Sequence, residues 1–396
     1  MKKLIAIFAV LLMAAPVFAA DWEFYGSQRM ATWYIQNDFG DSEVNGEKDD
    51  WGLRWDFQDN SRLGAKVKAD KVKGQIELGL NMGDTNRGAG FASPGNKGGE
   101  FNGTSGGDGI VSTRRAYGEW KFSDNASLKV GKDYSPVSNL VSGQVFDDDF
   151  GLLGNGDFYG KRPGQIGLQI GGFEIALITN ALKDSAPAAF SPQPSGSDPD
   201  WNIPKIEARY TLKMDMFELI PFGGFQYYKV ASTDTTEAAG TLTDDVDIYS
   251  YVGGLVAKVN IGAFYVAAEG AYGQNWNNAN WSTGVNSDSA AASSALLEDG
   301  DDIKDSTSWM AMGIVGLRFT DTVKFEAGFG YRVDDPDASG VDDITGWSAY
   351  GQVVLTLAPG VYLIPEVGYF DYGDDPITDD DNGYTWYAGA KWQIDF

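Results

Sequence analysis

The residues of this chain that could do chemistry are carboxylates and amines, because its 396 residues include neither histidine nor cysteine. A Ser-His-Asp triad needs a histidine base and a thiol nucleophile needs a cysteine, so both of these hydrolase arrangements are excluded. Ordinary zinc sites use cysteine and histidine ligands, so they are excluded as well. These absences remove the commonest hydrolase and metalloenzyme classes, and we expect a protein that is not an enzyme and that needs no cofactor, with a barrel enzyme as an alternative.

Acidic residues dominate the charge, since 56 Asp and Glu against 30 Lys and Arg give a formal net charge of -26. They gather in runs between apolar segments, at residues 244–247, 298–305, 334–343 and 371–381, which we interpret as solvated loops. This excess argues against a nucleic-acid partner, because phosphate binding needs basic side chains. Divalent cations could bind loosely at such loops. No run has the spacing of an EF-hand, however, so solubility is the simpler interpretation.

The beginning of the chain has the pattern of a secretory signal peptide. Two lysines precede an apolar run at residues 4–15, and the small residue Ala19 marks a cleavage site. The run is too short for a comfortable membrane span, although an anchor helix is the alternative. We expect residues 1–19 to be removed and residues 20–396 to form one exported domain.

The segment at residues 384–396, YTWYAGAKWQIDF, shows which kind of element positions the charged residues. Its apolar residues alternate with polar ones, which is the two-residue period of a strand. The apolar face consists of Tyr384, Trp386, Ala388, Ala390, Trp392, Ile394 and Phe396. The sequence predicts no helix that could cover this face. We therefore expect this face to meet lipid and this strand to close a barrel.

Alternating segments recur along the whole chain. We count about 16, at residues 22–35, 51–67, 72–80, 110–122, 127–134, 161–170, 173–181, 203–212, 217–229, 248–259, 263–274, 307–319, 323–333, 345–357, 361–371 and 384–396. Short and long connections alternate, which places the short turns at one end of the molecule and the long loops at the other. The sequence predicts an all-β fold, a transmembrane antiparallel β-barrel of about 16 strands.

Short motifs in a fixed order carry a resemblance to a known family. They are FYGS at residues 24–27, NSRLGAKVKAD at 60–70, TRRAYGEWKF at 113–122, LKVGKDYSP at 128–136 and the terminal Phe396. With them the chain resembles the general bacterial porins, and among these the subfamily of sulfate-reducing bacteria. The resemblance implies a homotrimeric diffusion channel in the outer membrane, surrounded by lipid and lipopolysaccharide. It also implies that Phe396 is the assembly signal that the barrel insertion machinery reads.

The resemblance places the pore constriction in the connection after the fifth strand, at residues 135–160. In such porins this loop folds into the lumen, and its acidic residues face basic residues on the opposite wall. The corresponding set here is Asp147, Asp148, Asp149 and Asp157 in the loop, with Arg62, Lys66, Arg114, Arg115 and Lys161 across from them. Apolar residues such as Phe146 and Phe158 could pin the loop inside, whereas an exposed acidic loop is the alternative.

Two arginines in the fourth strand leave an alternative open. The resemblance directs Arg114 into the lumen, whereas simple alternation with Trp120 facing outwards directs Arg115 there. An arginine in lipid would cost several kcal/mol, so one of the two faces a neighbouring subunit or reaches the lumen through a local distortion. Arg29 in the first strand has the same ambiguity.

Passive diffusion of small hydrophilic solutes and ions is the function that these features predict. Nearly balanced charges at the constriction, together with an acidic mouth, predict weak cation selectivity. Lys66, Lys68 and Lys73 keep a substrate-selective channel, for a sugar or an anion, as an alternative. An outer-membrane adhesin or structural barrel, with long acidic loops that bind partners, is a further alternative.

Overall fold

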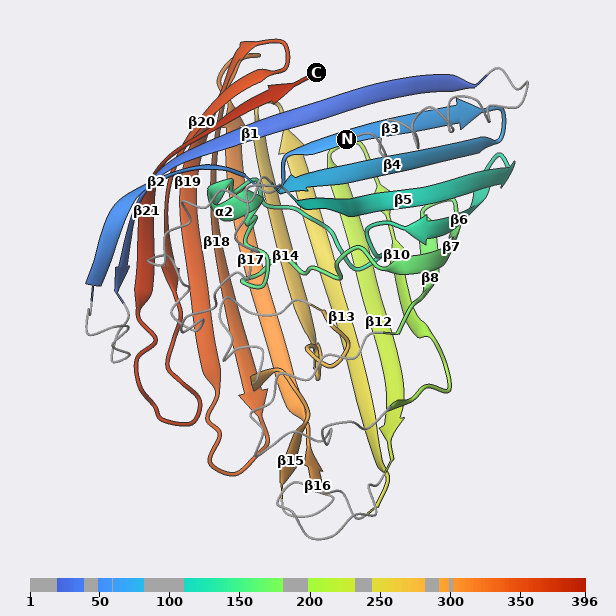
Figure 1. The fold of residues 1–396 in the computed structure, drawn as a ribbon, viewed down its shortest axis with the longest axis vertical. Coiled ribbons are helices and arrows are strands. Elements are labelled where there is room, and N and C mark those ends of the chain that lie inside the picture. Colours follow the sequence, from blue (N-terminus) through green and yellow to red (C-terminus); the bar gives the residue numbers. More distant parts are fainter. Residues whose placement is uncertain are drawn as a thin grey trace.

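A computed structural model describes residues 20–38, 49–58, 60–81, 110–180, 199–231, 244–281, 292–298 and 302–396. The predicted signal peptide lies outside these residues, as do parts of several predicted loops. The described chain forms a closed antiparallel β-barrel of 16 wall strands (Figure 1), which confirms the predicted fold class. Among the residues described, no helix is long and apolar enough to cross a membrane.

The wall strands follow one another around the barrel in chain order. They are β1 (Asp21–Asp38), β2 (Asp49–Phe57), β3 (Arg62–Ala69), β4 (Val72–Asn81), β5 (Ile110–Ser123), β6 (Ala126–Lys132), β7 (Gly164–Ile170), β8 (Phe173–Ile178), β9 (Pro199–Asp200), β10 (Lys205–Tyr210), β11 (Leu212–Lys213), β12 (Phe217–Val230), β13 (Val246–Ile261), β14 (Phe264–Gln274), β17 (Ser306–Arg318), β18 (Val323–Pro336), β19 (Ile344–Ala358), β20 (Val361–Asp371) and β21 (Tyr384–Asp395). Two wall strands are interrupted, so β2 and β3 form one of them and β9, β10 and β11 form another. A separate hairpin joins β15 (Leu296–Glu298) to β16 (Asp302–Lys304).

The barrel closes where the last strand pairs with the first. β21 pairs with β1 in a register that runs from Ser27 opposite Asp395 to Asp38 opposite Tyr384. The predicted faces of β21 are confirmed, because Trp392 and Ile394 are 46% and 53% exposed on the outside while Tyr387 is fully buried in the lumen. The same alternation runs along β1, whose odd-numbered residues from Ser27 to Asn37 are buried inside.

The two ends of the barrel differ as the sequence predicted. Short turns at residues 70–71, 124–125, 171–172, 214–216, 262–263, 319–322 and 359–360 lie at one end. The chain terminus lies at this end too, since the Asp395 N–H donates to the carbonyl of Gly360 at 2.8 Å. Gly360 has a φ of 77°, a value that glycine adopts at little cost in such a turn. The strand ends that the longer connections join lie at the opposite end, where Figure 1 shows β15 and β16 far from the C-terminus.

One predicted strand and one predicted loop need correction. The strand predicted at residues 51–67 is interrupted at residues 58–61, where the Arg29 N–H donates to the Ser61 hydroxyl at 3.0 Å instead of to a ladder carbonyl. The acidic run at residues 334–343 is not wholly solvated. Asp334 belongs to β18, is fully buried and pairs with Arg332 at 2.7 Å, because an inward-facing carboxylate needs a cationic partner.

Candidate functional site: a constriction inside the barrel

The connection between β6 and β7, residues 133–163, folds into the barrel and carries α2 (Phe146–Asp149), a single turn that lies between the walls in Figure 1. Buried backbone N–H groups need acceptors, and carboxylates on the wall strands provide them. The pairs are Gly143 with Glu326 at 2.9 Å, Val145 with Glu366 at 2.8 Å, Phe146 with Glu366 at 2.9 Å and Phe158 with Glu269 at 3.1 Å. The predicted inward folding of this loop is therefore confirmed.

Aromatic contacts hold the loop against the wall at two places. Phe146 stacks on Tyr387 with ring centroids 3.7 Å apart and meets the edge of Trp33 at 5.4 Å. Phe158 meets the edge of Trp276 at 5.0 Å. Because all of these rings except Phe146 are fully buried and Phe146 nearly so, the loop is part of the barrel's packed interior.

The three consecutive aspartates of α2 point to different partners. Their φ angles are 44° at Asp147, 65° at Asp148 and 61° at Asp149, a left-handed run that aspartate tolerates better than most residues. Asp147 pairs with Arg54 at 2.8 Å, and Asp149 pairs with Arg29 and, at 2.6 Å, with Lys391. Burial alone would raise the pKa of Asp149, but Lys391 and Arg29 together lower it.

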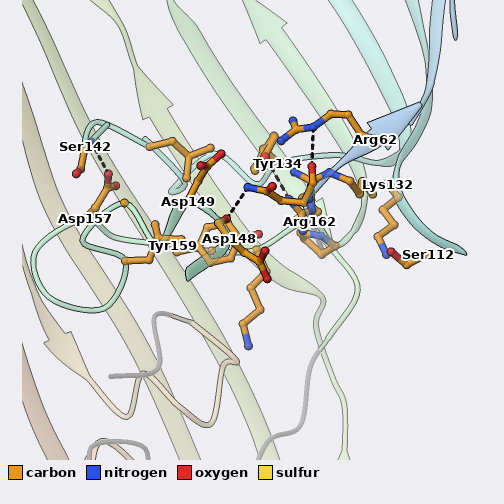
Figure 2. A pocket seen from close by; sticks show the side chains of 18 of the residues that line it. Arg62, Ser112, Lys132, Tyr134, Ser142, Asp148, Asp149, Asp157, Tyr159 and Arg162 are labelled. Atoms are coloured by element: carbon orange, nitrogen blue, oxygen red, sulfur yellow. Dashed lines mark hydrogen bonds between the residues drawn. The ribbon is translucent and has the colours of Figure 1, made fainter. Parts of the chain in front are cut away.

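A cavity of about 1080 Å³ lies between this loop and the wall that β3, β5, β6 and β10 contribute. Figure 2 shows Asp148, Asp149 and Asp157 toward one side of it, and Arg62, Lys132 and Arg162 toward the other. Neutral hydrogen-bonding groups such as those of Asn60, Ser112 and Tyr134 complete the lining. Water and small polar solutes fit such a surface, whereas an apolar solute would leave its polar groups without partners.

Six of the nine residues that the sequence assigned to the constriction line this cavity, namely Arg62, Arg114, Asp148, Asp149, Asp157 and Lys161. Asp157 is fully buried, however, and its carboxylate accepts hydrogen bonds from the Val141 and Ser142 N–H groups at 2.5 and 3.0 Å. Asp157 therefore stabilises the conformation of the loop.

The other three residues of that set are not part of the lining. Lys66 pairs with Glu23 at 3.0 Å toward the short-turn end, and Arg115 pairs with Asp133 at 2.7 Å. Asp147 pairs with Arg54, as described above. Each of them has an opposite charge at contact distance, so its field at the cavity is reduced.

A β-bulge answers the question about the two arginines of β5. Glu77 of β4 pairs with Arg115 and the next residue, Leu78, pairs with Thr113, so Arg114 is the extra residue. A bulge places two successive side chains on one face. Both arginines therefore reach the lumen, where Arg114 pairs with Glu77 at 2.9 Å. Of the two alternatives, a neighbouring subunit or a local distortion, the distortion is therefore correct. Arg29 also faces the lumen.

A second inward segment was not predicted. Residues 275–281, which follow β14, were assigned to a long loop, but Trp276 and Trp281 are fully buried. Trp281 donates from Nε1 to Glu207 at 2.7 Å, and Lys161 of the first loop donates to Asn280. The signal in the sequence is the pair of tryptophans in NWNNANW, which are large apolar residues in a segment taken as solvated.

Charges in the lining are not balanced, in contrast to the prediction. Its basic residues are the seven Arg62, Arg114, Lys132, Lys161, Arg162, Lys205 and Lys391, and its acidic residues are the three Asp148, Asp149 and Asp157. Sequence reasoning missed Lys132, Arg162, Lys205 and Lys391. The first two flank the ends of the loop in GKDY and GKRPG, whereas nothing in the sequence distinguishes the last two.

Metal binding is a separate question from the lining. Within the described ranges, no group of three or more acidic side chains is arranged to hold a metal ion. Loose binding of divalent cations at the acidic loops stays a prediction.

Comparison with known proteins shows the fold. The chain is similar to the outer membrane channel DcaP of Acinetobacter baumannii, with a TM-score of 0.66, 17% identity and coverage of 95% of this chain and 97% of that one. It is also similar to an anion-selective porin from Comamonas acidovorans (TM-score 0.53, 14% identity, 95% and 100% covered) and to the trimer form of OmpT, an outer membrane protein of Vibrio cholerae (TM-score 0.52, 12% identity, 95% and 99% covered). No family model and no curated protein matches the sequence. The chain thus has the β-barrel fold of outer-membrane porins.

Proposed function

We propose that this protein is a porin of the outer membrane, a water-filled channel for the passive diffusion of small hydrophilic solutes and ions, and that it catalyses no reaction. One observation carries the proposal, namely a cavity of about 1080 Å³, lined by many charged and hydrogen-bonding side chains, beside an inward-folded loop and inside a closed barrel. An apolar outer surface supports the membrane location. The narrower resemblance to the porins of sulfate-reducing bacteria is part of the hypothesis and rests on the sequence motifs.

The geometry supports passive diffusion that requires no conformational change. Solutes cross while they stay hydrated, and the inward loop sets the upper size limit. Charges on opposite sides of the cavity, Asp148 on the loop and the basic groups on the wall, create a field across the path. Dipolar solutes gain energy by aligning in this field, so polar molecules are favoured over apolar ones of the same size.

Selectivity is the finer part of the hypothesis. The sequence predicts weak cation selectivity, because the long loops at the mouth are acidic. Charges at the mouth are screened within about 8 Å at physiological ionic strength, so groups that line the cavity weigh more. Their basic excess counts against a cation preference.

Assembly partners complete the proposal. We expect a homotrimer in lipid and lipopolysaccharide, which the trimer form of the similar OmpT supports. We also expect the insertion machinery to read Phe396, a residue that is 67% exposed and whose backbone exchanges hydrogen bonds with Gly26 at 2.7 and 3.1 Å. Deletion of Phe396 should lower the amount of folded protein in the outer membrane. An unchanged amount would refute this role.

Planar bilayer recording of the purified protein tests the channel itself. A diffusion channel gives stepwise ionic conductance that rises in proportion to salt, whereas a substrate-selective channel shows saturable block by one solute. An adhesin or structural barrel with a closed lumen gives neither. Absence of conductance from protein with a native circular dichroism spectrum would refute the proposed function.

A further inference from the structure

We propose that the second inward segment, residues 275–281, is a further constriction element, which is locked to the inward loop and closes the side of the lumen formed by β12, β13 and β14. Solutes then pass along the side of β3 to β10, where the cavity lies. The inference rests on the proposed channel function. It adds a second determinant of the size limit, with Asn280 as the residue of this segment that reaches the path.

The second inward segment, NWNNANW, is suited to burial although four of its seven residues are asparagine. Six of the seven are fully buried, and Asn280 is partly exposed. The asparagine side chains are hydrogen-bonded inside the protein. Asn275 accepts from the Ser306 N–H at 2.9 Å, and Asn278 accepts from the Ala295 N–H at 2.8 Å. Because buried polar groups need partners, these bonds allow the segment to lie in the lumen instead of in solvent.

The barrel wall leaves space for both tryptophans of the segment by presenting glycine. A Cβ atom at Gly224 of β12 would lie 2.6 Å from the Trp281 ring, and one at Gly273 of β14 would lie 2.6 Å from Nε1 of Trp276. Both rings belong to one buried cluster with side chains of β12, β13, β14 and β17. Among the residues described, none from these four strands lines the cavity. The tryptophans therefore fill this side of the lumen like a packed core.

The second inward segment is also joined to the inward loop. Phe158 of the loop meets the edge of the Trp276 ring, with ring centroids 5.0 Å apart. Glu207 of β10 is fully buried and binds both elements through its two carboxylate oxygens. One oxygen accepts from the Trp281 indole at 2.7 Å, and the other accepts from the Val137 N–H of the loop at 3.5 Å. The loop and the segment therefore hold each other in place.

Asn280 lies where the two elements meet at the edge of the cavity. Its side-chain oxygen accepts a hydrogen bond from Lys161 of the inward loop, and both residues line the cavity. The carbonyl of the preceding residue, Ala279, accepts from Lys205 of β10 at 3.0 Å, which fixes the backbone at this point. A group attached at position 280 therefore enters the path, whereas one attached at position 279 meets the buried cluster.

Thiol labelling tests whether Asn280 lies on the path, because the chain has no cysteine of its own. In planar bilayers, a charged methanethiosulfonate reagent should react with Asn280→Cys and lower its unitary conductance by about half, since the added group narrows the path. Ala279→Cys is the matched control, because it is adjacent and fully buried, and its conductance should not change. An unchanged conductance of Asn280→Cys, or an equal loss in both variants, would overturn the inference.

Removal of both tryptophans tests whether the segment closes its side of the lumen. Trp276→Ala with Trp281→Ala should raise the unitary conductance about twofold and admit larger neutral polyethylene glycols, because a second water-filled path opens beside the first. The control, Trp309→Ala with Trp347→Ala, removes two tryptophans from the outer face of the barrel and should change neither quantity.

A segment that only stabilises the fold predicts a different result. The urea midpoint of the Trp276 and Trp281 variant would then fall with no change in conductance or in the size of polymer admitted, which would overturn the inference while the channel function stands. If this variant does not fold, the labelling of Asn280→Cys decides. If the wild-type protein does not conduct, the proposed function itself fails.

Discussion

The two sides of the barrel interior differ in how they are filled. On the side of β1 and β19 to β21, residues such as Trp33, Phe146, Phe370 and Tyr387 form a buried aromatic cluster with the inward loop. On the side of β3 to β6, arginines, lysines and hydroxyl groups border a cavity. The same period-two pattern places side chains in the lumen on both sides. Their chemistry then decides whether the loop packs against them or leaves an open path.

Because of this difference, one side of the barrel sets the width of the path and the other side sets its ion selectivity. The packed side fixes where the loop lies and therefore how wide the path is. The open side borders the cavity with charged and hydroxyl side chains, so its residues set the charge of the path. We expect substitutions on the packed side to change folding most, and substitutions on the open side to change ion preference.

The largest effect should come from Trp33→Ala. Trp33 is fully buried and contacts both Phe146 and Tyr387, so its loss leaves a cavity where the loop is anchored. Replacement of a buried tryptophan by alanine costs about 3–5 kcal/mol of unfolding free energy. Urea unfolding in lipid vesicles, followed by circular dichroism, measures the change. Trp33→Phe, which keeps a ring, should lose less than half as much, and equal losses would contradict the packing role.

A smaller effect should come from Gly389→Ala on the same side. A Cβ atom there would lie 2.0 Å from the Thr32 carbonyl oxygen and 2.6 Å from the Trp33 ring, so no side chain fits although position 389 faces the lumen. The cost should be about 1–3 kcal/mol, as for other overpacked sites. Lysine at this position, which parity alone would allow, should be worse still.

Gly118→Ala on the open side's outer face is the matched control. A Cβ atom at Gly118 meets no atom within 4 Å, so this substitution should leave the urea midpoint unchanged or raise it slightly. Equal stability of the Gly389→Ala and Gly118→Ala variants would contradict the conclusion that a side chain at position 389 clashes with Trp33.

A pH effect should follow from Asp157, which lies in the inward loop and not in a spanning strand. Burial raises the pKa of Asp157 to about 7, above its ordinary value of 3.8. Between these values the folded protein binds more protons than the unfolded chain, so stability should fall as the pH rises from about 4 to about 7. Asp157→Asn keeps an acceptor oxygen and should flatten this slope in urea titrations at several pH values. A slope unchanged in the variant would assign the effect to another group, such as Glu269 beside it.

The smallest effect on stability should come from Asp148→Asn on the loop face of the cavity. The urea midpoint should not change, but the reversal potential should move toward anions, because a negative charge leaves the path. Neutralising two exposed aspartates, Asp335 near the end of β18 and Asp337 just after it, should matter less and should lose its effect in high salt. Asp334 is unsuitable for that comparison, since it is buried beside Arg332. A larger shift from the outer pair at physiological salt would mean that the loop does not form the constriction.

Most strands, their faces and the alternation of turns and loops could be predicted from the residues alone. These features depend on local period-two patterning, which can be read in a segment such as residues 384–396 without knowledge of its neighbours. The inward loop was predicted through the family resemblance, and its apolar residues were consistent with burial.

Which charges face the path could not be predicted in this way. The bulge that turns both Arg114 and Arg115 inward depends on pairing with β4, and the pairing of Asp149 with Lys391 joins residues far apart in the chain. The buried segment with Trp276 and Trp281 depends on contacts across the lumen. Such contacts are non-local, so no pattern within one strand encodes them, and the excess of basic residues along the path follows from them.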